Sequence, residues 1–246
     1  MSSVSWLSPG DPTQRTGGYL YNARMVEGLR ELGVSVSVVP LEGDWPNPEA
    51  GEVHEAELAR IESGSIVVAD GLLWPGLAQR SRDALCARCT VWVVVHSLAD
   101  KESDQEHGDQ ALRREVESLR GVHGWFATSR RTAALLSERL GHSDQHVVVP
   151  GTDPAFDRDQ GEPEALLSVG HLIPRKGHDQ VLRSLAELKD LSWSLRIVGS
   201  LKRDAECAAE LVALRDELGL TGRVTFVGEC DEQALDEEYR RAGVLV

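Results

Sequence analysis

The chain of 246 residues lacks any hydrophobic run close to the roughly 20 residues that a membrane-spanning helix needs. Its first residues, MSSVSWLSPGD, lack the charged start and the apolar core of a secretory signal peptide. Cysteine is also scarce, with four residues, which suits a compartment where thiols stay reduced. We therefore expect a cytoplasmic protein.

The sequence has no dense run of lysine and arginine. Lys and Arg number 26 against 40 Asp and Glu, so the formal net charge is −14. Such a field repels the phosphates of nucleic acids, and we expect no nucleic-acid partner. A local pair of cations can still reverse the potential within one cleft, so the net charge does not exclude an anionic small molecule as a ligand.

Several motifs of common enzyme classes are missing. Cys86 and Cys89 form the only close cysteine pair, and no second pair or histidine-rich segment accompanies them, so we interpret them as ordinary buried thiols. His54-Glu55 is not an HExxH zinc motif because position 58 is leucine. There is no Walker loop, no G-x-S-x-G and no G-x-G-x-x-G after a first strand. We predict no metal site and no bound cofactor.

Segments typical of strands alternate with segments typical of helices along the whole chain, which indicates parallel sheets of the doubly wound type. The expected strands are 4–7, 34–39, 66–69, 91–95, 124–128, 146–149, 165–169, 193–198 and 223–227. The expected helices are 18–32, 52–62, 77–87, 112–119, 130–140, 178–189, 204–218 and 231–242, with a charged loop over 100–110. The polar segment 153–164 is the expected linker. We predict an α/β fold of two Rossmann-like domains, 1–155 and 163–246, with a cleft between them.

The last residues, Val244-Leu245-Val246, look like a strand that has just begun. The second domain would then hold three full strands and part of a fourth. A sheet that stops there would expose apolar surface and an unpaired edge. We expect an incomplete second domain.

The stretch 166–179, LLSVGHLIPRKGHD, offers a site for an anion. A buried strand ends in a turn at Gly170, a short loop carries Arg175 and Lys176, and a helix follows. Backbone N–H groups at a helix start and two cations would converge outside the carboxyl end of the strand. Two cations at a helix start interact unfavourably with the helix dipole, and a bound anion would offset this cost. The side chains of arginine and lysine suit the oxygens of a diphosphate.

This strand–PRKG–helix order resembles the donor-side loop of glycosyltransferase family 4. Further along, LRIVG (195–199), RVTFVG (223–228) and YRRAG (239–243) resemble that family's L-x-I-V-G, R-V-x-F-x-G and Y-x-x-A-D landmarks. The resemblance implies the GT-B architecture and a retaining enzyme that uses nucleotide sugars without a metal. It covers all of this chain, which spans about two-thirds of a family member, because the family's E-x7-E segment is absent. We therefore expect a C-terminally truncated member.

The resemblance also implies roles for residues in the first domain. Gly17 and Gly18 correspond to the family's glycine-rich loop near the donor phosphates and the acceptor, and a tight turn without a ligand is the alternative. His96 directly follows an apolar strand, where open α/β sheets bind ligands. It corresponds to a histidine that contacts the donor sugar, and a hydrogen-bonded structural histidine is the alternative.

In the second domain the resemblance makes Arg175 and Lys176 the catalytic cations that neutralise the leaving diphosphate. Gly199 and Glu229 follow strands whose loops border the nucleotide in the family. His171 departs from the pattern, because many members carry a basic residue directly after the strand's glycine. Either His171 itself contacts the phosphate, or Arg175 takes over the role of the family's basic residue. The sequence leaves both alternatives open.

The leading hypothesis is a glycosyltransferase that moves a hexose from a nucleoside-diphosphate sugar to a hydroxyl acceptor with retention of configuration. The acceptor is a sugar, a lipid or a small molecule, and a lipid acceptor would bring the protein to a membrane surface. One alternative is an inactive truncated homologue or a nucleotide-sugar-binding remnant. Others are a sugar-nucleotide epimerase of GT-B shape and an NAD-dependent dehydrogenase, which the missing dinucleotide motif disfavours.

Overall fold

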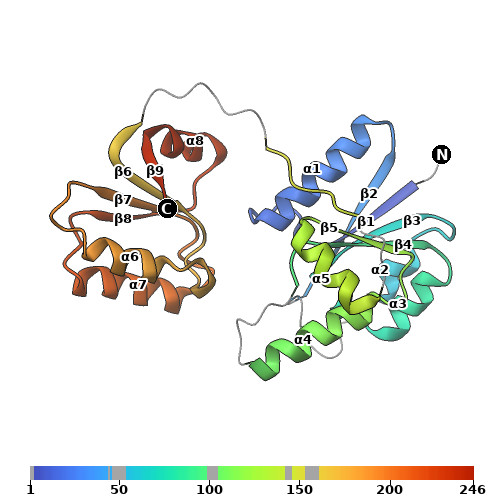
Figure 1. Cartoon of the computed structure of the whole chain (residues 1–246). Helices are drawn as coiled ribbons and strands as arrows, with labels where there is room; N and C mark the ends of the chain where they lie inside the picture. Colours follow the sequence, from blue (N-terminus) through green and yellow to red (C-terminus); the bar gives the residue numbers. More distant parts are fainter. Residues whose placement is uncertain (1–2, 44, 46–53, 99–104, 142–145, 153–160) are drawn as a thin grey trace. The chain divides into compact units, whose positions relative to one another are not determined.

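A computed structural model describes residues 3–43, 45, 54–98, 105–141, 146–152 and 161–246, without the side chains of 105–109. The chain divides into two compact units, Met1–Thr152 (unit 1) and Asp153–Val246 (unit 2) (Figure 1). Each unit is a parallel sheet with helices on both faces, and each has its own hydrophobic cores.

The sheet of unit 1 has five parallel strands in the order β2-β1-β3-β4-β5. The strands are β1 (Ser3–Pro9), β2 (Ser35–Leu41), β3 (Ile66–Asp70), β4 (Thr90–Val95) and β5 (Gly124–Ala127). The inner strands are apolar over nearly their whole length, as in β4, TVWVVV. Such continuous apolar runs are expected where both faces of a parallel sheet are covered.

Helices cover the two faces of this sheet unequally (Figure 1). Helix α1 (Gly17–Glu31) packs its Tyr21 and Val26 on one face. The opposite face carries α2 (Glu55–Ala59), α3 (Gln79–Cys86), α4 (Gln105–Ser118) and α5 (Arg130–Leu140), with a 3-10 turn, η1 (Trp74–Gly76). Beside α1, over β1 and β2, lies a groove of about 520 Å³ whose wall includes Trp6 and Val38.

The sheet of unit 2 has four parallel strands in the order β8-β7-β6-β9. They are β6 (Glu162–Val169), β7 (Ser194–Val198), β8 (Val224–Gly228) and β9 (Ala242–Leu245). Helices α6 (His178–Ala186) and α7 (Ala205–Glu217) cover one face, and α8 (Glu232–Arg241) covers the other (Figure 1). A 3-10 turn, η2 (Pro174–Lys176), precedes α6.

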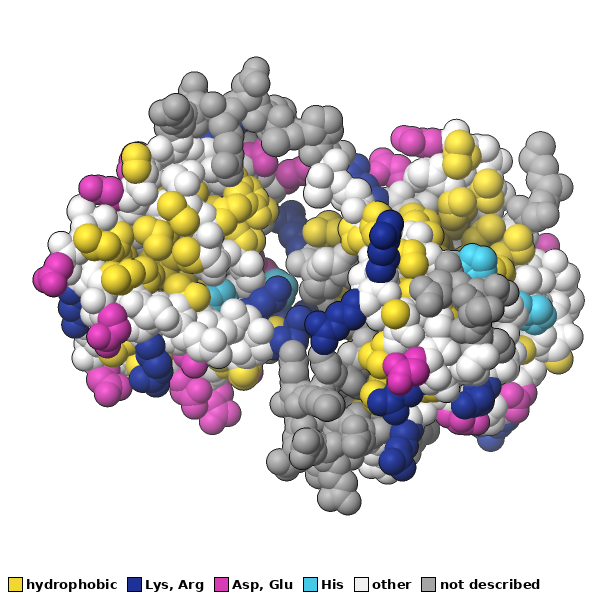
Figure 2. Space-filling model, viewed as in Figure 1, with side chains coloured by type: hydrophobic (Ala, Val, Ile, Leu, Met, Phe, Trp, Pro, Cys, Tyr) yellow, Lys and Arg dark blue, Asp and Glu magenta, His cyan; other side chains and the backbone are white. Residues whose placement is uncertain are grey.

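Ionic contacts add to the apolar packing of unit 2. Arg196 on β7 binds Glu238 on α8 through two hydrogen bonds, one of them 2.6 Å from Nη2 to Oε1. These bonds hold the pKa of the Glu238 carboxyl below its usual value, because they favour its charged form. Figure 2 shows acidic and basic side chains interspersed over the visible surface of each unit.

The fold confirms the expected α/β architecture with two Rossmann-like parts and corrects several of its details. Residues 146–149 form no strand, because only Ala127 at the end of the short strand β5 pairs with them, through an isolated bridge to Val147. Helix α4 begins at Gln105, inside the segment expected to be a loop. Part of the expected linker, 153–160, lies outside the described residues, and β6 already begins at Glu162. No helix in the described part of the chain has the length and apolar character to cross a membrane.

Candidate functional site

The strand order of unit 1 reverses between β1 and β3. The chain leaves β1 through α1 to reach β2 on one side, and β3 lies on the other side of β1. Open α/β sheets bind ligands outside the carboxyl ends of their strands at such a point. Three features of unit 1 lie there: the start of α1, Asp70 at the end of β3, and His96 directly after β4.

Hydrogen bonds join these features into one network. Asn22 on α1 donates from Nδ2 to Oδ2 of Asp70, and its Oδ1 lies 3.2 Å from Nε2 of His96. The same Nε2 is 3.3 Å from Oδ2 of Asp70. Asn22 and Asp70 are only 5% and 3% exposed, whereas the His96 side chain is 21% exposed. His96 is therefore the member of the network that a ligand can reach.

The ring of His96 is enclosed by α1. Tyr21 packs edge-on against it, with ring centroids 5.2 Å apart. On Gly18, an added Cβ would lie 3.4 Å from Cδ2 of the imidazole, so the glycine backbone lies close to the ring. The structure thus brings together two predicted site residues, Gly18 and His96. Gly17 is exposed, and an added Cβ there would meet no atom within 4 Å.

In unit 2, the loops that follow β6, β7 and β8 are bonded to one another. Gly170 N donates to Val198 O at 2.8 Å, and Gly199 N donates to Gly228 O at 2.9 Å. Leu172 N donates to Ser200 O at 3.1 Å. The carboxyl ends of the three strands therefore form one continuous surface of loop backbone.

His171 and Gly199 are held within this surface. Nδ1 of His171 accepts a hydrogen bond of 3.1 Å from Ser200 N, so this nitrogen is used by the protein and carries no proton. An added Cβ on Gly199 would lie 1.9 Å from Gly170 O. Gly199 is therefore required for the close approach of two strand ends, which gives it a structural reason beside its predicted role at the nucleotide.

The two predicted cations lie in the turn η2, one step before the helix. Arg175 and Lys176 are exposed, and α6 begins only at His178. The N–H groups of Lys176 and Gly177 already donate to Ile173 and Pro174 within the turn, both at 3.0 Å. The cations therefore lie in the short segment before the helix, where the sequence predicted them.

The stem of Lys176 lies across Gly170. An added Cβ on Gly170 would be 3.1 Å from Cδ and 3.3 Å from Cε of Lys176. The glycine that follows the strand thus leaves space for the lysine stem, which lies against the loop after β6. Glu229 follows β8, is exposed, and has no contact with the other predicted residues among the interactions found in the described part of unit 2.

Sequence reasoning missed a buried histidine beneath these loops. His178 is 3% exposed, and its ring nitrogens lie 3.4 Å from Ser168 Oγ and 3.3 Å from Gly170 O. Burial lowers the pKa of the imidazole, and the charge of Lys176 acts in the same direction. Its signal in the sequence was weak, because a histidine at a helix start usually faces water.

Asn22 and Asp70 were missed as well. The sequence contains one clue to the role of Asn22. It is a polar residue next to Tyr21 and one turn before Val26, on the buried side of α1. Asp70 ends an apolar strand just as His96 follows one. Their pairing could not be deduced, because 48 positions separate the two residues and only the sheet order brings them together.

A comparison with protein families finds one match in unit 2. Residues 152–246 match the family described as Glycosyl transferases group 1. A comparison with curated proteins finds no match to the chain.

Three solved structures illustrate the similarity of the fold. Sucrose-phosphate synthase from Thermosynechococcus elongatus has a TM-score of 0.76 at 20% identity, over 100% of this chain and 75% of that one. HepE from Anabaena, in complex with UDP and glucose, has a TM-score of 0.70 at 14% identity, over 100% of this chain and 73% of that one. The lipopolysaccharide outer core galactosyltransferase WaaB has a TM-score of 0.61 at 17% identity, over 99% of this chain and 73% of that one.

These likenesses establish the GT-B fold, with the chain spanning about three quarters of each of those proteins. The family match in unit 2 and this fold together support a glycosyltransferase.

Proposed function

We propose that the protein moves a hexose from a nucleoside-diphosphate sugar to a hydroxyl acceptor, with retention of configuration, as in glycosyltransferase family 4. Residues 163–246 would form the donor domain and residues 1–155 the acceptor domain. The family match over 152–246 supports the donor assignment.

The observation that carries this proposal is the position of Lys176. Its stem lies against Gly170, directly after β6, and Arg175 precedes it in the same turn, η2. The protein as a whole is acidic, with a formal net charge of −14. A diphosphate fits two neighbouring cations, and this pair lies in the loop after a strand of a parallel sheet.

In the proposed reaction, Arg175 and Lys176 neutralise the charge that builds on the leaving diphosphate, which stabilises the transition state electrostatically. The leaving phosphate takes the proton of the acceptor hydroxyl, so no further base is needed. His96 contacts the donor sugar, while Gly17 and Gly18 allow the backbone to approach the ligand. Gly199 and Glu229 border the nucleotide. A lipid acceptor would add a membrane surface to the partners.

Calorimetric titration with UDP, GDP and ADP tests the donor site. UDP comes first, because the similar fold of HepE was solved with UDP and with UDP-glucose. We expect one diphosphate to bind, and Lys176→Ala to weaken binding about tenfold or more, since a charge-assisted contact contributes about 1.5–3 kcal/mol.

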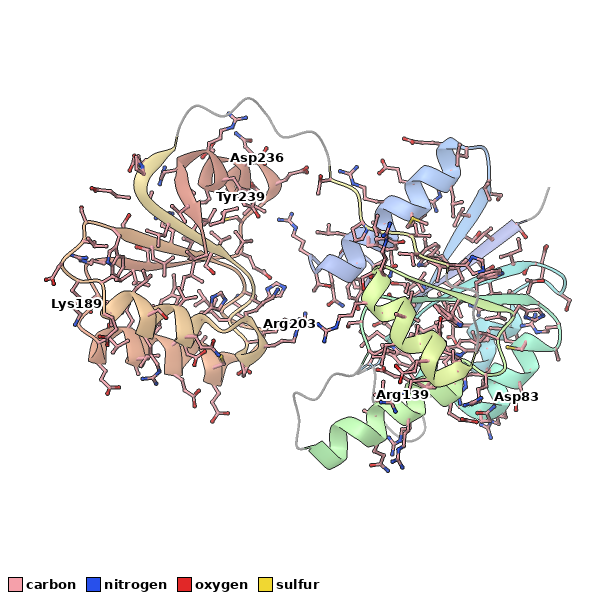
Figure 3. The ribbon with its side chains drawn as sticks, in the orientation of Figure 1. Asp83, Arg139, Lys189, Arg203, Asp236 and Tyr239 are labelled. Carbon is pink, nitrogen blue, oxygen red and sulfur yellow. The ribbon has the colours of Figure 1, made fainter. Side chains whose placement is uncertain are left out.

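Lys189→Ala is the matched control. Lys189 is an exposed lysine of unit 2 that precedes β7, and Figure 3 shows it at the opposite side of the unit from Arg203, which follows β7. This variant should bind as the unsubstituted protein does. Equal loss in both variants, or no binding by folded protein, would contradict the donor site. Binding without turnover would favour the inactive remnant, and a changed sugar nucleotide without acceptor would favour an epimerase.

A further inference from the structure

The network in unit 1 is ordered by the chemistry of Asp70. A carboxylate accepts hydrogen bonds and has no proton to donate. Oδ1 of Asp70 accepts from Leu72 N at 2.7 Å, and Oδ2 accepts from the side-chain amide of Asn22. Because Asp70 is 3% exposed, the protein rather than water supplies these donors.

Asp70 therefore decides how the amide of Asn22 is turned. The NH2 group of Asn22 must face the carboxylate, which leaves its carbonyl oxygen facing His96. A carbonyl oxygen only accepts, so Nε2 of His96 must carry the proton of the bond between them. In the neutral imidazole the other nitrogen, Nδ1, is then an acceptor, and no partner for Nδ1 is found among the described residues.

We propose that Asp70 and Asn22 are positioning residues that keep the proton of His96 on Nε2, so that Nδ1 accepts a hydrogen bond from a hydroxyl of the substrate. The contact of Nδ1 with a substrate hydroxyl rests on the proposed function, in which His96 contacts the donor sugar. Gly18 and Tyr21 contact the ring and limit its rotation, so both the tautomer and the orientation of His96 are set before a ligand arrives.

Nitrogen NMR of the histidine side chains tests this arrangement in the full chain. The protein has eight histidines, and His96→Gln assigns the signals of His96. We expect a protonated Nε2 and an unprotonated Nδ1 in the neutral imidazole. In Asp70→Asn the new amide can donate as well as accept, so Asn22 is free to turn over. We expect the Nδ1 signal of that variant to shift toward the protonated position.

Asp83→Asn is the matched control, because Asp83 is an exposed aspartate on α3 in the same unit, shown in Figure 3. It should leave the His96 signals unchanged. Asp70→Ser, whose hydroxyl also donates and accepts, replaces the asparagine variant if that one does not fold. A protonated Nδ1 in the unsubstituted protein would overturn the proposal, and so would an unchanged tautomer in a folded Asp70 variant.

The NMR measurement does not depend on turnover, and nucleotide binding by unit 2 is measured separately. Failure of nucleotide binding with the expected tautomer would reject the proposed function and leave the arrangement of His96 in place. A different tautomer with normal nucleotide binding would reject the arrangement alone.

Discussion

Gly17 and Gly199 both occupy positions where a ligand is expected to approach the backbone, and the space around them differs. An added Cβ at Gly17 meets nothing within 4 Å, whereas at Gly199 it meets Gly170 O at 1.9 Å and His171 N at 2.8 Å. The atoms in the way at Gly199 belong to the backbone and cannot move aside cheaply. Gly199 is thus needed by the fold itself, while Gly17 is not.

Substitution by alanine separates these two cases. We expect Gly199→Ala to lower the free energy of unfolding by about 3 kcal/mol or more, because overpacking against backbone is costly. Gly17→Ala should leave it unchanged or raise it by about 0.5–1 kcal/mol, since Gly17 opens helix α1. Urea unfolding followed by circular dichroism measures both. Equal midpoints for the two variants would contradict the close approach at Gly199.

At the residue scale, the sequence predicted the positions that lie directly at the ends of strands. His96 and His171 each follow a strand, and their places could be read from the alternation of segments. Their hydrogen-bond partners could not, because Asn22 and Ser200 reach them through the sheet order. Only the structure therefore shows which ring nitrogen of each histidine makes a hydrogen bond.

Among the elements, β7 and α8 are joined by the ion pair of Arg196 and Glu238, whose side chains are 30% and 11% exposed. Both hydrogen bonds run between charged groups, and such bonds are stronger than neutral ones. They connect a central strand of the unit 2 sheet to the helix that covers its second face.

Glu238→Gln should lower the free energy of unfolding by about 1–2 kcal/mol at neutral pH, because it removes the charge from a partly buried pair. The folded-state pKa of Glu238 lies below its unfolded value. Its contribution is therefore present above the unfolded value of about 4.3 and is lost as the pH falls through the folded value. Thermal unfolding from pH 7 to pH 3 measures the difference, which should shrink with acid. A difference that stays constant would show that the pair adds no pH-dependent stability.

Most elements were predictable because their apolar periodicity is strong. The expected strand over 146–149 failed because tertiary pairing decides the state of a short segment. Residues 146–149 read as a strand, yet β5 pairs with them only through Ala127. In contrast, β9 forms over Ala242–Leu245 because β6 offers it a parallel partner.

For the whole molecule, the main feature is that each unit has cores of its own. Leu136 on α5 belongs to the large core of unit 1, and Leu182 on α6 belongs to the large core of unit 2. Both side chains are fully buried, at 0% exposure. Each unit can therefore be destabilised separately from within.

Reciprocal truncations test this independence. Leu182→Ala should cost about 2–5 kcal/mol and raise amide hydrogen exchange in β6, β7 and β8, with little change in β1, β3 and β4. Leu136→Ala should give the opposite pattern. Hydrogen exchange followed by mass spectrometry resolves the two sets of peptides. Equal increases in both units from either variant would show that the units unfold together.

The close packing of Gly170 against Gly199 also has a consequence for protein engineering. Loop 170–177 carries Arg175 and Lys176, but the backbone of loop 199–202 holds it in place through Ser200 and the missing side chain at position 199. A graft of the first loop alone onto another scaffold would lose the shape that aims its cations. The transferable module is the pair of loops with both glycines retained.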